Sequence, residues 1–227
     1  MTVTMTRSAG TRVARHPVRR FDWPATLALH LLPAAAMFAF EAALRALGLS
    51  PQFALTLAFA FVLTPIQLGL LLHAAHRATG RWSLLALPSV LSFQRRLPPR
   101  LYLMLLPSLA AIALGVAMLL DPDLVPEGSG AGVLAATLAV NGLLRPVVQE
   151  VYFRAYLLPR LPVGGGLAVV TSAALSTVQY AGHPQLLVFM LVVQLILTAV
   201  TVRLDSVRVS VAAHCLIGAA APLAALL

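Results

Sequence analysis

The sequence is short of charge. Charged residues make up only 10% of its 227 residues, whereas a soluble domain usually carries about one quarter. Hydrophobic residues reach 60%, and the mean hydropathy is +0.91. Apolar runs of membrane-spanning length recur from Ala25 to the C-terminus, and they are continuous rather than short and alternating. The composition therefore predicts an all-α polytopic membrane protein, a bundle of transmembrane helices folded as one domain.

Lysine is absent: all 16 basic residues are arginines, set against seven acidic residues, and the formal net charge is +9. The arginines flank hydrophobic runs instead of gathering on one soluble face, and aromatic residues are only 7% of the chain. This pattern argues against nucleic-acid binding. Basic loops that fix the orientation and contact anionic lipid heads explain the charge better, which makes the lipid bilayer the expected partner.

Cysteine and several catalytic signatures are also scarce. Cys215 is the only cysteine, so no disulfide can form within the chain. The sequence has no HExxH, no Gly-rich phosphate loop, no GxSxG and no CxxC. Soluble-type zincins, nucleotide hydrolases and serine hydrolases therefore have no support.

The hydrophobic runs predict the membrane topology, because a span needs about 20 apolar residues. Seven spans are expected, at 25–47, 53–73, 101–120, 133–158, 167–183, 186–202 and 207–226. Residues 82–93 are apolar but too short to cross, and arginines flank them, so they predict an interfacial or re-entrant helix. If this segment crosses instead, the number of spans is eight.

The remaining segments set the boundaries and the orientation. Residues 1–24 are expected to be a polar, basic tail without a cleavable signal, and residues 25–227 the transmembrane domain. Arginines occur in the connecting segments of one side of the membrane and are lacking in those of the other. The positive-inside rule then places the N-terminus in the cytoplasm and the C-terminus outside. We expect an integral protein of a bacterial plasma membrane.

Ionisable residues inside the predicted spans form the candidate site, because such groups are costly at membrane depth. Glu150 and Arg154 are four residues apart in the fourth span and share a helix face. His183 ends the fifth span, and His214 lies in the seventh. Elsewhere, Glu41 and Arg45 predict a structural i, i+4 pair, and His30 predicts a hydrogen bond to a neighbouring helix.

Two interpretations of this site stay open. In one, Glu150 and Arg154 are a buried ion pair and the histidines are packing residues. In the other, Glu150, His183 and His214 bind a divalent metal such as zinc, or they activate a water molecule and stabilise the oxyanion. Counted from the inner end of each span, Glu150 and His214 lie at roughly 12 and 10 Å but His183 at roughly 24 Å. A shared site therefore requires tilt, a late start of the fifth span, or a kink at Pro146.

A family resemblance rests on the fourth span and on the two histidines. The span follows the pattern Pro-x-x-[Glu]-Glu-x-x-Phe-Arg-[Gly]-x-Leu through Pro146, Glu150, Phe153, Arg154 and Leu157. A histidine then closes the next span, and another histidine lies in the last one. In this order the chain resembles the CPBP family of CAAX-protease and bacteriocin-processing (Abi) intramembrane endopeptidases. The resemblance covers about residues 132–226 and implies a protease core there.

The resemblance implies three motifs, and the sequence departs from each. In Glu-Glu-x-x-x-Arg, Gln149 replaces the leading Glu, which is the family's proposed water-activating base. In Phe-x-x-x-His, the histidine is kept as His183 and Gln179 replaces the Phe. In His-x-x-x-Asn/Asp, the histidine is kept as His214, but the motif ends in Gly218.

The first and third departures bear on catalysis. Gln149 cannot accept a proton at neutral pH, and loss of a positioned base typically costs ~10²–10⁴-fold in rate. Glu150 is the carboxylate that remains nearby, but its side chain leaves the helix about 100° around the axis from that of Gln149. Gly218 has no side chain to donate a hydrogen bond or to bind a ligand.

The favoured function is a CPBP-type intramembrane endopeptidase, a hydrolase of reduced activity. It would cut a peptide bond near the membrane interface of a membrane-embedded or lipidated substrate. Glu150 would be the base or a metal ligand, His183 and His214 ligands or oxyanion stabilisers, and Arg154 the partner that fixes Glu150. If it is metal-dependent, the enzyme is a metalloprotease.

Two alternatives are kept. A catalytically inactive relative, acting as a membrane scaffold or regulator, is motivated by Gln149 and Gly218. A transporter is supported only by the polytopic character, because the sequence shows no clear inverted repeat.

Overall fold

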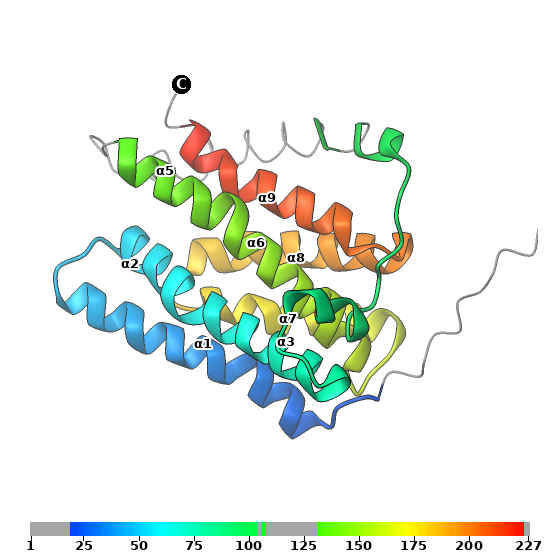
Figure 1. The fold of residues 1–227 in the computed structure, drawn as a ribbon. Coiled ribbons are helices and arrows are strands. Elements are labelled where there is room, and N and C mark those ends of the chain that lie inside the picture. Colours follow the sequence, from blue (N-terminus) through cyan, green and yellow to red (C-terminus); the bar gives the residue numbers. More distant parts are fainter. Residues whose placement is uncertain (1–18, 104–105, 108–130, 225–227) are drawn as a thin grey trace, which may run out of the picture.

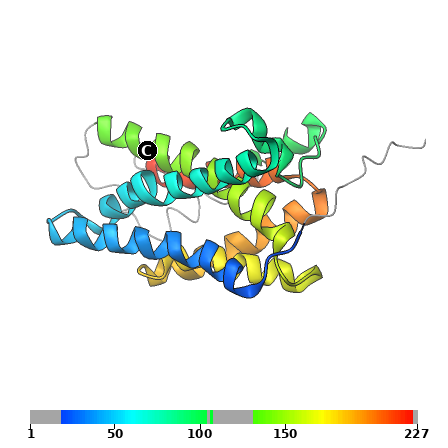
Figure 2. The ribbon, with the colours of Figure 1, turned by 60° about the horizontal axis from the view of Figure 1, so that its bottom comes forward.

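The computed structural model describes residues 19–103, 106–107 and 131–224. Regular structure in these residues is helical, and their β contact is an isolated antiparallel bridge between Gln94 and Ser206. The predicted all-α class is confirmed for this part of the chain. Figures 1 and 2 show the long helices side by side in one bundle. Most of the predicted third span, 101–120, lies outside the described residues.

The first helix, α1 (Trp23–Ala46), has clear boundary signals. Asp22 caps its start by accepting a hydrogen bond from the N–H of Ala25 at 2.8 Å. Pro24 lies in the first turn, where a missing N–H costs nothing. The chain turns away at Gly48, whose φ of +90° favours glycine. This helix matches the predicted span 25–47.

The second long helical stretch runs back along the first (Figure 1). It consists of α2 (Pro51–Ala58), the π-helical turn η1 (Phe59–Leu63) and α3 (Thr64–Thr79). Ser50 caps its start, and Gly80 ends it in the left-handed region at φ +72°. It contains the predicted span 53–73 and extends beyond both of its ends.

The second half of the chain carries the motif region. A continuous helical stretch covers residues 131–157 and is composed of α5 (Ala131–Ala139), η3 (Val140–Leu144), α6 (Arg145–Glu150) and η4 (Val151–Leu157). The short turn η5 (Leu158–Arg160) follows it. The remaining elements are α7 (Gly165–Thr177), η6 (Val178–Tyr180), α8 (Pro184–Leu204) and α9 (Val207–Ala224). α9 packs along η3 and α6, and α8 packs along α7.

Wide π-helical turns precede two prolines inside helices. η1 comes just before Pro65, and η3 just before Pro146. Proline has no N–H to donate, and its ring meets the carbonyl four residues earlier. That carbonyl belongs to Phe61 in the first case and to Gly142 in the second, and both lie inside the wide turn. The widened turn takes up both defects, so the helix continues through the proline.

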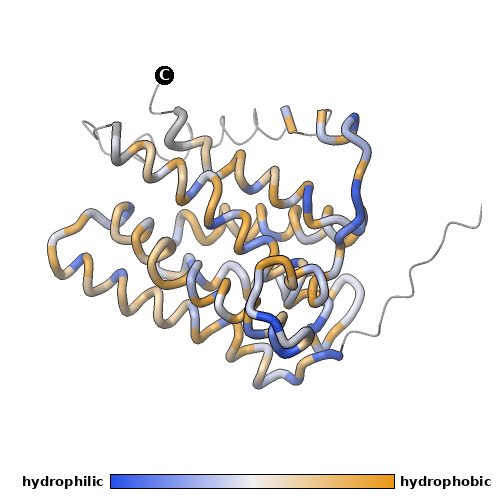
Figure 3. The backbone as a smooth tube through the Cα atoms, viewed as in Figure 1, coloured by the Kyte–Doolittle hydropathy of each residue, from blue (hydrophilic) through white to orange (hydrophobic). Residues whose placement is uncertain are grey.

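Among the described residues, three helices are long and apolar enough to cross a membrane: Trp23–Ala46, Pro51–Thr79 and Leu186–Leu204. Figure 3 shows hydrophobic residues along the helices and a hydrophilic stretch in the segment that follows η2 (Leu84–Ser89). Large apolar side chains such as Leu32, Phe61 and Val188 are exposed on the outside of the bundle. The membrane character follows from these features, while the count of seven or eight spans stays a prediction.

The segment between α3 and the third predicted span is a strap rather than a helix over its full length. Within residues 80–98, the helical part is the 3-10 turn Leu84–Ser89. The N–H of Ser92 donates to the carbonyl of Ala155 at 2.8 Å, and the N–H of Val207 donates to the carbonyl of Phe93 at 2.8 Å. Phe93 has a φ of +57°, which is an outlier for a bulky residue. The predicted helix at 82–93 is therefore shortened to Leu84–Ser89, because at Ser92 and Phe93 backbone bonds to other elements replace helical ones.

Candidate active site

Glu150 and Arg154 form an ion pair inside the bundle. Glu150 ends α6, and Arg154 lies four residues further, in η4. Arg154 Nη1 is 2.9 Å from Glu150 Oε1, and both side chains are 0% exposed. Removing such charges from water costs several kcal/mol per ion, so each of them depends on its partner. The helical spacing that suggested this pair from the sequence brings the two side chains together in the structure.

His214 joins the pair from α9. Its Nδ1 is 2.7 Å from Glu150 Oε1, and its side chain is 2% exposed. An ionised carboxylate only accepts hydrogen bonds, so beside ionised Glu150 the Nδ1 atom carries the proton and donates it. Nε2 of the neutral ring is then an acceptor. In this tautomer His214 has no second N–H with which to stabilise an oxyanion.

α8 supplies a fourth member, Gln194, which the sequence motifs did not point to. Arg154 Nη2 donates to the side-chain Oε1 of Gln194 and, at 3.5 Å, to its backbone carbonyl. Gln194 is fully buried. A signal was present in the sequence, because a lone amide in an apolar run is costly unless it is hydrogen-bonded. Glu150, Arg154, His214 and Gln194 are called the charged cluster below.

One oxygen of Glu150 has no partner. Oε1 meets both Arg154 and His214, whereas Oε2 is buried without a hydrogen bond from any described residue. Leaving a buried acceptor unpaired costs ~1–3 kcal/mol, and in native proteins such an atom calls for an explanation, such as a bound water or a catalytic role. Oε2 is therefore the free acceptor of the charged cluster.

A second polar network is built on Gln149, the residue next to Glu150. Gln149 Nε2 donates to Gln179 Oε1 at 2.9 Å, and Arg145 Nε donates to Gln149 Oε1 at 3.5 Å. The Arg145 guanidinium also donates to the Tyr180 hydroxyl. Gln149 and Gln179 are both buried. Gln149, Gln179, Arg145 and Tyr180 are called the amide cluster below, and none of them carries a carboxylate.

The structure does not bring His183 to the charged cluster. His183 is the cap residue before α8, and its Nε2 is 2.9 Å from Glu41 Oε1 on α1. Gln194 lies 11 residues further along the same chain segment, which is roughly 16 Å of helical rise. The expectation that Glu150, His183 and His214 share one site is corrected, because the rise of α8 separates them. The pair of Glu41 with Arg45 is present, at 3.7 Å.

Gln179 and His30, both named in the sequence analysis, lie near the site. The residue of η6 that meets Gln149 is Gln179, in the turn that precedes His183. Within the described residues, His30 makes no hydrogen bond to a neighbouring helix, and its Nδ1 lies 2.7 Å from the carbonyl of Thr26 in its own helix. The His30 ring instead packs 5.5 Å from the ring of Phe153.

Gly218 is a point of close helix contact. A Cβ atom at this position would collide with the backbone carbonyl of Asn141 in η3. Gly142, also in η3, faces Ala219 across the same contact, where an added Cβ would lie 3.2 Å from the alanine Cβ. The third motif therefore ends in glycine because η3 and α9 touch there, and the backbone leaves no room for an Asn or Asp side chain.

The described residues do not supply three metal ligands at one point. No group of three or more His, Cys, Asp or Glu side chains among them is placed to hold a metal ion. Glu150 and His214 bond to each other, and Arg154 already brings a cation to the same carboxylate oxygen. A zinc site needs three or four converging ligands. The predicted set of Glu150, His183 and His214 does not fit one in this geometry.

Comparison with protein families gives one match: the model described as Type II CAAX prenyl endopeptidase Rce1-like fits residues 131–220. Searches of curated proteins and of solved structures gave no match. The matched residues contain both clusters as well as Gly218. The resemblance to the CAAX proteases is thereby confirmed for residues 131–220, which are similar to the Rce1-like type II CAAX prenyl endopeptidases.

Proposed function

We propose that the protein is a CAAX-type intramembrane endopeptidase that uses Glu150 as its base. The observation that carries this proposal is the free oxygen of Glu150. Oε1 is held by Arg154 and His214, so the carboxylate has a fixed orientation, while Oε2 has no partner among the described residues. A fixed carboxylate with one oxygen free of protein hydrogen bonds can accept a proton from a bound water, as a general base does.

The chain's own residues account for the proton movements. A water molecule bound at Oε2 gives its proton to Glu150 as its oxygen attacks the carbonyl carbon of the peptide bond. When the tetrahedral intermediate collapses and the C–N bond breaks, Glu150 passes the proton to the leaving amine. His214 and Arg154 both donate to the other oxygen, so the carboxylate stays oriented through both steps.

The buried charges balance in this scheme. Ionised Glu150 and Arg154 cancel, and His214 stays neutral while its Nδ1–H donates to Glu150. Gln194 accepts from the Arg154 guanidinium and so fixes its position. The substrate is a membrane-embedded or lipidated peptide that is cut near the membrane interface, as the family match suggests.

The test is peptide cleavage by the purified full-length protein in proteoliposomes. Glu150→Gln keeps the shape and removes the base, so cleavage should fall by at least ~10²-fold. Glu41→Gln is the matched control, since Glu41 is also a buried carboxylate in a transmembrane helix but pairs with His183. Unchanged cleavage by a folded Glu150→Gln protein would remove Glu150 from the mechanism. A chelator should leave cleavage unchanged, because the ligand set for zinc does not converge.

A second candidate, a non-catalytic relative that binds but does not cut, is favoured by a separate observation. Gln149 and Gln179 hydrogen-bond each other, and neither carboxamide can take a proton from water at neutral pH. The charged cluster is also closed to solvent, with Glu150 0% exposed. Under this candidate the native chain cleaves nothing, and the two amides are the reason.

The discriminating variant replaces both amides at once. Gln149→Glu with Gln179→Phe should then create cleavage that the native protein lacks, because it returns the carboxylate and the aromatic ring that the family motifs carry at these two positions. Gly218→Asn is unsuitable for this purpose, because its Cβ would collide with Asn141. Strong cleavage by the native protein would eliminate the second candidate.

A further inference from the structure

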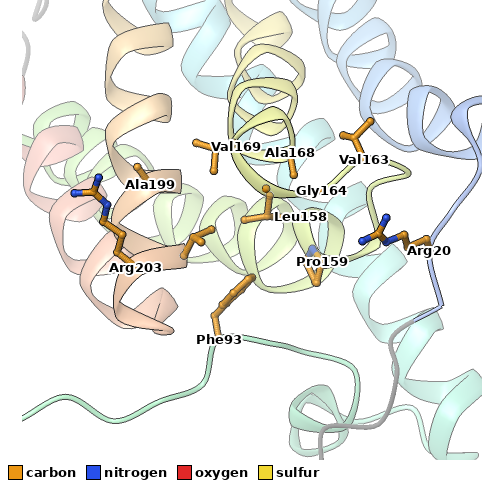
Figure 4. Close-up of a pocket in the computed structure, with 13 residues that line it drawn as sticks. Arg20, Phe93, Leu158, Pro159, Val163, Gly164, Ala168, Val169, Ala199 and Arg203 are labelled. Carbon is orange, nitrogen blue, oxygen red and sulfur yellow. The ribbon is translucent and has the colours of Figure 1, made fainter.

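A cavity of about 590 Å³ lies at one end of the bundle, away from the proposed peptidase chemistry. It is bounded by η5, the first turn of α7, the last turns of α8 and the strap at Phe93 (Figure 4). This volume lies within the roughly 300–1,000 Å³ range of small-molecule sites. Its apolar wall includes Leu158, Val169 and Ala199. The cavity can therefore take up hydrocarbon.

Two arginines flank the cavity on opposite sides. Figure 4 shows Arg20 on one side of it and Arg203, on α8, on the other, with the Phe93 ring between them. Both are exposed, and neither has an ion pair with any described residue. No acidic residue lines the cavity. Its mouth is therefore cationic, and its charge is not neutralised by the part of the protein that the structure describes.

Local structure holds Arg20 in place beside the cavity. The N–H of Phe21 donates to the carbonyl of Arg160 at 2.7 Å, which fixes the backbone next to Arg20. The Arg20 guanidinium lies over Gly164, where an added Cβ would be 3.5 Å from its Nη2. Gly165 has a φ of +59°, and Gly164 caps α7 without a side-chain bond. Because the glycines have no side chains at this edge of the cavity, a ligand can approach both the Arg20 guanidinium and the backbone.

Phe93 supports the same interpretation from the other wall. Its φ of +57° is unusual for a phenylalanine, and the bond from Val207 N–H to its carbonyl holds it there. Strained backbone in a native protein suggests a functional constraint. Here the strain directs an aromatic ring into the cavity between the two arginines.

We propose that this cavity binds one anionic phospholipid, with the phosphate at the cationic mouth that Arg20 and Arg203 flank and the start of an acyl chain lying on Leu158, Val169 and Ala199. Opposite charge fixes the head, and the apolar wall takes the chain. The N-terminal residues of this chain are a poor alternative occupant, because residues 1–18 contain arginines and no acidic residue. The site also lies at the arginine-rich end of the bundle, where anionic lipid heads are expected.

The test is lipid binding by the purified full-length protein, measured by native mass spectrometry with phosphatidylglycerol or phosphatidylcholine added. Each arginine near an anionic lipid contributes about 1 kcal/mol, so the preference for phosphatidylglycerol should be roughly 25-fold and should vanish in the Arg20→Gln/Arg203→Gln variant. Arg208→Gln is the matched control, since Arg208 is exposed but does not line the cavity. It should keep the preference.

A second variant guards against a general effect of surface charge. Ala199→Trp fills the apolar wall and leaves both arginines intact, so it should reduce the binding of phosphatidylglycerol. The proposal is overturned if the double arginine variant keeps the native preference, or if Arg208→Gln loses as much. It is also overturned if inorganic phosphate binds as tightly as the lipid and Ala199→Trp has no effect, because the site would then hold a free phosphate. None of these readouts depends on peptide cleavage.

Discussion

The charged cluster and the amide cluster are adjacent in sequence but differ in kind. Both start from one turn of α6, where Gln149 and Glu150 are consecutive and point in directions about 100° apart. Glu150 meets a guanidinium and an imidazole, while Gln149 meets another amide. Both are fully buried. The same helix thus holds one network built on an ion pair and one whose cation, Arg145, has neutral hydrogen-bond partners.

The two clusters should contribute differently to the stability of the fold. A buried charge without its partner is far more costly than a buried amide without its partner. The charged cluster therefore cannot lose a member cheaply, whether or not the protein cuts peptides. In the amide cluster, Gln149 occupies the position at which the family resemblance expects the water-activating base, so a substitution there tests whether the protein cuts peptides more than it tests stability.

The largest expected effect comes from removing the cation of each network. Arg154→Met leaves Glu150 buried with only a neutral partner, and the free energy of unfolding should fall by about 3–5 kcal/mol. Arg145→Met removes hydrogen bonds to neutral groups and a contact with the ring of Phe59, at a cost of about 1–2 kcal/mol. Thermal unfolding in detergent compares the two. Equal losses in the free energy of unfolding would show that the charged cluster depends on its cation no more than the amide cluster does.

The next effect tests the helix contact that supports both networks from α9. Gly218→Ala forces a Cβ against the carbonyl of Asn141, and overpacking against backbone should cost about 3 kcal/mol. Gly69→Ala is the control, because a Cβ there meets nothing within 4 Å. The control should be neutral or slightly stabilising. Thermal unfolding in detergent measures both variants. If Gly218→Ala is as stable as the native protein, the close contact between Gly218 and Asn141 is wrong.

A smaller effect is expected from the same type of substitution, Gln→Leu, made separately in each cluster. Gln194→Leu removes an acceptor from the charged Arg154, and bonds to charged groups are worth about 1.5–3 kcal/mol. Gln179→Leu removes a bond between two amides and should cost about 1 kcal/mol. The measurement is the urea concentration at the unfolding midpoint, which should be lower for Gln194→Leu than for Gln179→Leu. A reversed order would mean that the amide cluster is the more stabilising of the two.

The smallest effect concerns His183, which belongs to neither cluster. His183→Ala removes one hydrogen bond to Glu41, so stability should fall by about 1 kcal/mol and any peptide cleavage should be unchanged. Glu41 keeps its contact with Arg45. Cleavage and thermal unfolding measured on the same preparation test both parts. Loss of cleavage without loss of stability would place His183 in the chemistry after all.

Particular residues show which parts of the site the sequence could predict. The i, i+4 spacing of Glu150 and Arg154 predicted their pairing, because helical geometry alone brings such residues together. The meeting of His214 with Glu150 was consistent with their similar depths. The roles of Gln179 and Gln194 were not predictable in this way, because they depend on how η6 and α8 pack against the motif helix. His183 was misplaced for the same reason.

The sequence by itself determined the helical membrane fold, the family and the boundaries of most helices. Apolar run length, caps such as Asp22 and Ser50, and helix-ending glycines act locally, so they can be read along the chain. Only the tertiary structure decided that Gln149 faces Gln179, that Gly218 touches Asn141, and that Arg20 and Arg203 share a cavity. These are contacts between helices that are far apart in sequence, and their geometry comes from side-chain packing that no local pattern records.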